Sequence, residues 1–217
     1  MPYVQLIRAP NPGPMTLDGT NTWVITDEHE GALVVDPGPA IQTHLEAILA
    51  VCSPRLVTIV LTHRHLDHSE GAAMLAERAG CGVRAADPQF RIRPDGISRL
   101  ITGDMVLGRG TTVITHPDGD LAAYFDSLDL LEGLVRTRNV AELLPGHGPI
   151  VADPLPWLSF YRDHRRERLG EIRAALAAGD RTASEIVARV YANVDRSVWP
   201  AAEQSVRAQL DYLREHD

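Results

Sequence analysis

Four side chains able to bind a metal fall within residues 63–68, in the stretch THRHLDH: His63, His65, Asp67 and His68. In an extended loop, His63 and His65 would point the same way, while Asp67 and His68 would begin the next helix. Imidazole and carboxylate groups together favour zinc, with manganese and iron left open. An ordinary polar loop is disfavoured, because three of the nine histidines of the chain lie within these six positions. The spacing therefore predicts two adjacent metal ions.

Two later residues are candidates to complete the ligand set. Asp104 follows the short apolar run at residues 100–102, which would place a carboxylate at the end of a strand. His147 lies in the sequence PGHG, where glycines allow a close approach of the backbone. Either residue alone could simply occupy a turn. Together with the histidine cluster, both are expected to be ligands.

The elements that would position these residues alternate between strand and helix. Apolar, β-branched runs predict strands at residues 3–7, 22–26, 32–35, 56–61, 81–85 and 100–102. Helical spacing follows at residues 41–49, 72–79, 120–135, 155–178 and 201–215, and Thr182 or Ser184 could cap a further helix that ends near residue 191. The histidine cluster comes directly after the continuous run LVTIVL, at the strand end where α/β sheets hold ligands. We predict an α/β layered fold.

Composition excludes several kinds of chemistry. The chain has a formal net charge of −8, and all 21 of its basic residues are arginine. The absence of lysine excludes a Schiff base, a phosphate-loop lysine and a Ser-Lys hydrolase. The acidic balance disfavours nucleic acid as a partner, although bound cations would change the sign locally. Without a visible signal peptide or a long apolar segment, we expect a soluble cytoplasmic protein with no membrane partner.

The motifs H-x-H-x-D-H, G-D and P-G-H-G together resemble the metallo-beta-lactamase superfamily. The stretches NPGPMTLDGTNTW, VVDPG, GDMVLGRGTTVI and HRRER resemble its beta-lactamase-like protein 2 group, whose studied members are single-strand-specific endoribonucleases. TASEIVARVY and WPAAEQSVRAQLDYL resemble the small winged-helix-like appendage of that group. The resemblance implies a four-layer αββα sandwich, shortened in its second half, over residues 1–153. A long helix and the helical appendage would follow in residues 154–217.

The resemblance also implies a role for each candidate residue. His63 and His65 would hold a first metal, and Asp104 would bridge both metals. The second metal would be held by Asp67, His68 and His147. A metal-bound hydroxide would be the nucleophile, oriented by Asp67 as the catalytic residue.

Asp36, in VVDPG, would support the ligands without binding metal.

The chain departs from the family pattern in one place. Members carry a third histidine for the first metal, in a T-P-G-H-T-like motif before the G-D strand. Here the chain passes from RAADPQFRI to RPDGISRLITGD, so a segment of several tens of residues is expected to be missing. We therefore expect one or two zinc ions per chain, and we do not expect His116 to replace the lost ligand. Strand edges left open by the loss could be covered in a homodimer.

Three functions follow from these observations. The leading one is a metal-dependent phosphodiesterase, an endoribonuclease that acts on single-stranded RNA, with the arginine-rich segment before the appendage available to hold phosphates. A glyoxalase II-like thioesterase, which acts on a small ester or thioester, would use nearly the same ligands. The third is a non-catalytic relative whose first metal site is incomplete.

Overall fold

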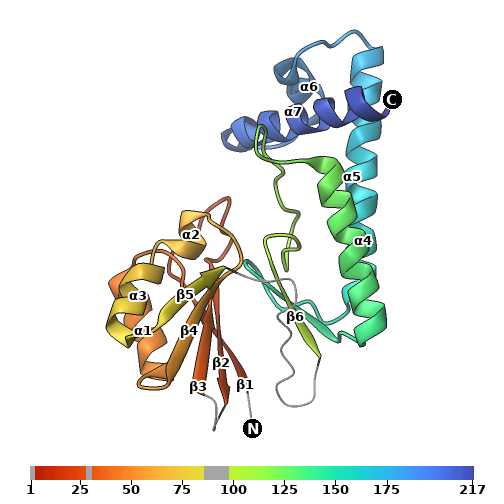
Figure 1. The fold of residues 1–217 in the computed structure, drawn as a ribbon. Helices are drawn as coiled ribbons and strands as arrows, with labels where there is room; N and C mark the ends of the chain where they lie inside the picture. Colours follow the sequence, from red (N-terminus) through yellow and green to blue (C-terminus); the bar gives the residue numbers. More distant parts are fainter. Residues whose placement is uncertain (1–2, 28–30, 86–97) are drawn as a thin grey trace. The chain divides into compact units, whose positions relative to one another are not determined.

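The computed structural model describes residues 3–27, 31–85 and 98–217, which divide into two compact units (Figure 1). The first unit contains residues Met1–Gly110 and Val135–Pro154. The second contains Thr111–Leu134 and Leu155–Asp217. The second unit thus takes in a segment from before residue 153, and the division into residues 1–153 and 154–217 stays a prediction.

Five strands of the first unit form one mixed sheet in the order β1-β2-β3-β4-β5. They are β1 (Tyr3–Arg8), β2 (Asn21–Asp27), β3 (Gly31–Val35), β4 (Leu56–Leu61) and β5 (Gly82–Ala85). β1, β2 and β3 are antiparallel, whereas β4 runs parallel to both β3 and β5. The apolar runs in the sequence predicted all five strands to within two residues at each end.

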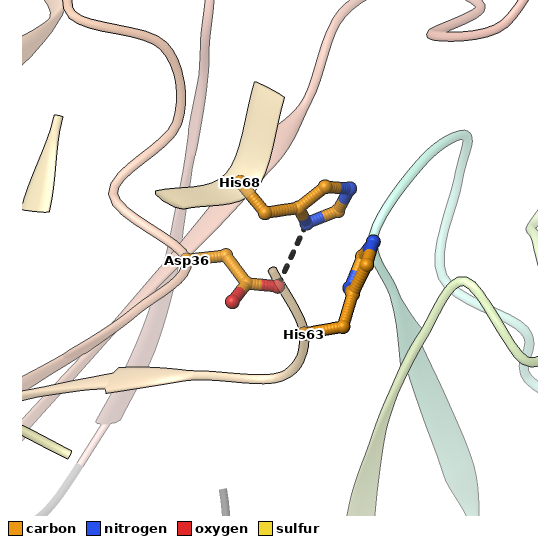
Figure 2. Close-up of side chains that lie close together, drawn as sticks. All are labelled: Asp36, His63 and His68. Carbon is orange, nitrogen blue, oxygen red and sulfur yellow. Dashed lines mark hydrogen bonds and ion pairs between the residues drawn. The ribbon is translucent and has the colours of Figure 1, made fainter. Parts of the chain in front are cut away.

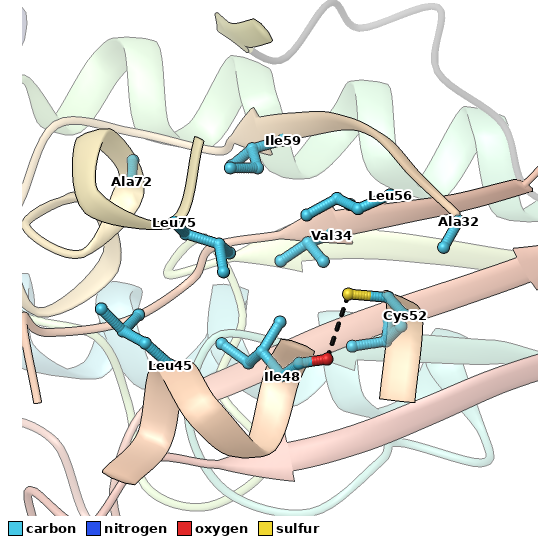
Figure 3. Packing of buried hydrophobic residues seen from close by; sticks show 10 residues of the cluster. Ala32, Val34, Leu45, Ile48, Cys52, Leu56, Ile59, Ala72 and Leu75 are labelled. Atoms are coloured by element: carbon cyan, nitrogen blue, oxygen red, sulfur yellow. Dashed lines mark hydrogen bonds between the residues drawn. The ribbon is translucent and has the colours of Figure 1, made fainter. Parts of the chain in front are cut away.

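Helices α1 (Gln42–Cys52) and α3 (Ala72–Ala79) cover one face of this sheet. Figure 3 shows Leu45 and Ile48 of α1 and Leu75 of α3 packed against Val34 and Ile59 of the strands. All five side chains are fully buried. Each helix connects two parallel strands, as a βαβ crossover requires.

A smaller sheet packs on the opposite face. It consists of β6 (Arg99–Gly103) and β7 (Glu142–Pro145), which run parallel. Leu144 of β7 packs with Trp23, Val35 and Val60 of the larger sheet, and the Trp23 indole donates a hydrogen bond to the carbonyl of Pro145. The sequence did not predict β7, because its apolar part consists of only two residues.

The segment expected to be missing would follow residue 85, and residues 86–97 lie outside the described part of the chain. The loss therefore stays a prediction at that point.

The second unit contains α5 (Pro154–Ala177), α6 (Ala183–Val190), the short 3₁₀ helix η2 (Arg196–Val198) and α7 (Trp199–His216). Helix α4 (Leu121–Arg138) begins in this unit and lies beside α5 (Figure 1). Thr182 caps α6: its hydroxyl accepts from the Glu185 N–H, and the Glu185 carboxylate accepts from the Thr182 N–H. Among the described residues, no helix has both the length and the apolar character needed to cross a membrane.

The core beneath α1 yields a stability prediction. Ile48→Ala should lower the free energy of unfolding by about 2–5 kcal/mol, because it leaves a cavity between α1 and the sheet. Val57→Ala on β4 is the control, since that side chain is 59% exposed, and it should change stability by about 0.5 kcal/mol or less. Urea denaturation measures both, and equal effects would contradict this packing.

Candidate metal centre

The six predicted metal ligands all lie at the carboxyl ends of strands in the first unit. His63 and His65 belong to the loop after β4, and Asp67 and His68 belong to the following short helix α2 (Leu66–Ser69). Asp104 comes directly after β6, and His147 follows β7. These residues gather into overlapping groups whose potential ligand atoms lie within 4.8 Å of one another. The structure thus brings together residues that are far apart in the sequence.

One group is formed by Asp67, His68 and His147. The Nε2 atoms of the two histidines are 3.1 Å apart, and both rings are buried. Asp67 Oδ2 is 3.4 Å from His68 Nε2 and 3.2 Å from His147 Nε2. Two ring nitrogens and a carboxylate oxygen therefore face a common point.

A second group is formed by His63, His65 and Asp104, and a third, Asp36, His63 and His68, overlaps both. His63 Nε2 lies 3.0 Å from His65 Nδ1 and 3.7 Å from Asp104 Oδ2. The second oxygen of Asp104 lies 3.4 Å from His68 Nε2 and 3.5 Å from His147 Nε2. Asp104 thus stands between the two groups, one oxygen towards each, as a bridging ligand would.

Asp36 orients the His68 ring by accepting a hydrogen bond from its Nδ1 atom (Figure 2). It is buried at the end of β3, and its Oδ2 lies 2.9 Å from His68 Nδ1. The same carboxylate accepts hydrogen bonds from the N–H and the hydroxyl of Thr62, at 2.7 and 2.6 Å. A carboxylate can only accept, so His68 donates through Nδ1, and once the ring is neutral, as coordination requires, the lone pair of Nε2 is presented to the centre. This geometry agrees with a supporting role for Asp36.

The donor set fits a divalent cation. Asp104 Oδ1 is buried without a hydrogen-bond partner among the described residues, which leaves a carboxylate oxygen aimed at two imidazole nitrogens. A buried carboxylate oxygen without a hydrogen bond is costly, and a metal ion would satisfy it. Imidazole and carboxylate ligands suit zinc, manganese or iron.

The charges of the site act on one another strongly. Burial alone would lower the pKa of His68, but contacts with Asp104 and Asp36 outweigh it and raise that pKa to about 10. Burial likewise opposes protonation of His147, whereas Asp104 and Asp67 raise its pKa to about 9. The same histidines, against the effect of burial, hold the pKa of Asp104 well below its usual range. By contrast, burial and the neighbouring His68 lower the pKa of His63.

The backbone at Gly146 packs closely against the candidate ligands, and this requires a residue without a side chain. A Cβ atom at Gly146 would lie 2.5 Å from Asp104 Oδ1 and 2.7 Å from His68 Cε1. Only glycine therefore allows the chain before His147 to pass so close to the ligands.

Sequence reasoning missed the residue that fixes the His147 loop. Asn21 is fully buried at the start of β2, and its side-chain amide donates to the carbonyls of Pro145 and Gly148, at 3.1 and 2.8 Å. The Gly146 carbonyl accepts from the backbone N–H of Asn21 at 2.8 Å. A local signal did exist, because β2 begins with two polar residues, Asn21 and Thr22, directly before its apolar part.

The sequence analysis also did not single out Thr22 and His44, two buried residues that contact each other beside Asp36. The Thr22 hydroxyl donates to the Asp36 carbonyl at 2.6 Å and lies 2.9 Å from His44 Nε2. His116, by contrast, lies in the second unit, with its Nε2 3.4 Å from the carboxylate of Asp211.

Comparison with known proteins identifies related families for both parts of the chain. Residues 15–151 match the metallo-beta-lactamase superfamily, and residues 182–217 match the beta-lactamase associated winged helix domain. A beta-lactamase-like protein 2 homolog of Caenorhabditis elegans is 28% identical over 254 residues, which covers 97% of this chain and 83% of the relative. That alignment is longer than the 217 residues of this chain, so it contains gaps on this side.

Two further relatives bear on fold and function. An atrochrysone carboxyl ACP thioesterase of Aspergillus chevalieri is 26% identical over 242 residues, which covers 91% of this chain and 76% of the relative. The crystal structure of a beta-lactamase domain protein from Burkholderia ambifaria has a TM-score of 0.78 at 21% identity. It covers 98% of this chain and 86% of that chain, and it shows the same fold.

Metal binding should release protons. With pKa values of about 10 and 9, His68 and His147 retain protons at pH 7 in the metal-free protein, and coordination requires neutral rings. Zinc binding at pH 7 should therefore release at least one proton, and the affinity should increase as the pH rises towards 9. Calorimetry in buffers of different ionisation enthalpy measures this release. A heat that does not depend on the buffer would contradict it.

Asp36→Asn should lower metal affinity about 10–100-fold. The asparagine amide would present an N–H to His68 Nδ1, and this favours the ring form with its proton on Nε2, the atom that faces the centre. Competition with a fluorescent chelator measures the change. As a control, Asp180→Asn should leave the affinity unaltered, because this carboxylate pairs with Arg189 in the second unit.

Proposed function

We propose that this chain, which belongs to the metallo-beta-lactamase superfamily, is a metal-dependent hydrolase that cleaves phosphodiester bonds in single-stranded RNA. The observation that carries this proposal is the convergence of imidazole and carboxylate groups around Asp104, with one of its oxygens buried and free of hydrogen bonds among the described residues. The choice of RNA is supported by the similarity to a beta-lactamase-like protein 2 homolog along 97% of the chain.

The residues present would hold two cations unequally. His63, His65 and Asp104 would hold the first, while Asp67, His68 and His147 would hold the second, with Asp104 shared. A bound divalent ion lowers the pKa of coordinated water to about 7 and stabilises negative charge on the attacked group. His65 of the first set is exposed, whereas the second set has two buried histidines and Asp104 as a fourth group. We therefore expect the second set to bind its metal more tightly.

Asp67 is the residue best placed to accept a hydrogen bond from an attacking water. Its Oδ2 lies 3.2 Å from His147 Nε2, and the side chain is only partly buried, so water can reach it. Burial raises the pKa of this carboxyl, but the hydrogen bond to His147 and the charge of His68 outweigh it and lower the pKa. Asp67 is therefore ionised at neutral pH and can orient an attacking water by accepting its hydrogen bond. Asp36 keeps His68 in place through its own hydrogen bond.

Thioester hydrolysis is the second candidate. It is favoured by the similarity to the Aspergillus protein, which is named as an acyl carrier protein thioesterase. The same ligand groups would serve that reaction, because a thioester carbonyl also develops negative charge when it is attacked. A non-catalytic relative that retains only the second metal is the third candidate, and its support is the weaker first group.

His68→Ala should abolish RNA cleavage. Loss of this ligand should decrease kcat by at least about 100-fold with unstructured RNA in the presence of zinc or manganese. The bound metal, measured by elemental analysis, should decrease in parallel. His116→Ala is the matched control, since this partly exposed histidine pairs with Asp211 in the second unit.

The outcomes separate the three candidates. About two ions per chain together with cleavage of single-stranded RNA supports the proposal. A fully metallated protein that leaves RNA intact but hydrolyses an acyl thioester supports the second candidate. One tightly held ion without hydrolysis of either substrate supports the third.

A further inference from the structure

A cavity of about 350 Å³ lies within the second unit, where α4, α5 and α7 meet. Arg162, Arg166 and Arg173 line it from one face of α5. Arg166 follows Arg162 by four residues, and Arg173 follows Arg166 by seven. These spacings place side chains on the same side of a helix. The volume is within the range of small-molecule and cofactor pockets.

The three arginines differ in their partners. Arg162 donates to Glu132 at 2.8 Å and is also held by Asp129. Arg173 donates to both carboxylate oxygens of Asp217, at 2.7 and 2.5 Å. In the part of the chain that the structure describes, Arg166 has no hydrogen bond or ion pair, and it is exposed to solvent. Its planar fork of donors is therefore free to bind the oxygens of an anion.

Two aromatic rings complete the lining. Phe125 of α4 and Tyr212 of α7 both face the cavity, with ring centroids 5.8 Å apart and planes tilted by 59°. The ring of His216 is stacked on Tyr212 with centroids 4.2 Å apart, which helps to fix the orientation of the tyrosine. Aromatic faces beside a free arginine suit a ligand that combines a planar ring with a phosphate, because bases stack on aromatic side chains and guanidinium binds phosphate.

We propose that this cavity binds one nucleotide unit of the single-stranded RNA substrate, with Arg166 on the phosphate and with Tyr212 and Phe125 against the base. This inference rests on the proposed function, and it adds a binding site in a unit that contains none of the predicted metal ligands.

The local charge supports this assignment. The chain as a whole carries a formal charge of −8, which would repel RNA. Arg162 and Arg173 are balanced by their carboxylate partners, so Arg166 carries the positive charge that is available to a phosphate. An unbalanced arginine lets an acidic protein bind a polyanion at one place, and the binding should weaken as salt is added.

The test is a binding measurement on the full-length, metal-loaded protein. The probe is a short fluorescent oligouridine with phosphorothioate linkages, which keeps the backbone charge and resists cleavage. Arg166→Ala should weaken binding about 5–10-fold and reduce the slope of log affinity against log salt by about 0.7, the share of one single-strand phosphate. Arg207→Ala is the matched control. This exposed arginine of α7 pairs with Glu203 and does not line the cavity, so its loss should leave the affinity nearly unchanged.

Two further measurements test the aromatic part. Tyr212→Leu should weaken oligouridine binding about tenfold, because stacking on one base is lost. Uridine monophosphate should displace the probe at a lower concentration than inorganic phosphate does. Equal displacement by the two would indicate a simple anion site and overturn the proposal.

Failure of this inference can be distinguished from failure of the proposed function. The wild-type protein should hydrolyse a small chromogenic phosphodiester, which needs only the metal centre. If Arg166→Ala and Arg207→Ala bind oligouridine equally well, the cavity does not bind RNA, even where the diester is hydrolysed. If Arg166→Ala lowers the affinity, Arg207→Ala does not, and no diester is hydrolysed, then the cavity binds RNA but the hydrolase proposal is wrong.

Discussion

The hydrogen bond between Asp36 and His68 is the interaction on which the rest of the site depends. Asp36 lies at the end of β3, and its carboxylate also accepts from the N–H and hydroxyl of Thr62 at the end of β4. One buried carboxylate therefore joins two strand ends to the helix that carries His68. The same hydrogen bond fixes a proton on Nδ1 of His68, so that Nε2 is the ring atom available to a metal ion. Structural and chemical roles are served by a single contact.

Crowding so many ionisable groups into a partly buried place is unfavourable unless their charges compensate. In the metal-free protein, protons on His68 and His147 balance the negative charge of Asp67 and Asp104, which is why both histidine pKa values are raised. A divalent cation can take over this balance. It would also satisfy the oxygen of Asp104 that lacks a hydrogen bond among the described residues. The arrangement of these groups therefore favours a cation at one point. In the metal-free protein, protons on the two histidines supply that positive charge.

The second unit solves a different electrostatic problem. Most of its arginines are paired with carboxylates, as Arg162 is with Glu132 and Arg173 is with Asp217. Pairing keeps the helices together without creating an extended basic surface, which agrees with the acidic balance of the chain. Arg166, set beside aromatic rings, departs from this pattern. Because it has no carboxylate partner among the described residues, its donors are available to an anion.

Most secondary-structure elements and the candidate metal ligands could be predicted from the sequence alone. Period-two and period-3.6 patterns located most strands and helices, and the spacing in THRHLDH predicted four candidate ligands, because both signals are local. Tertiary structure decided what depends on distant contacts. The Asn21 side chain donates to the carbonyl of Pro145, 124 positions later in the chain, and β7, with only two apolar residues, pairs with β6. Arg166 of α5 and Tyr212 of α7 line the same cavity. No local pattern encodes these pairings, because each becomes favourable only after separate segments have packed together.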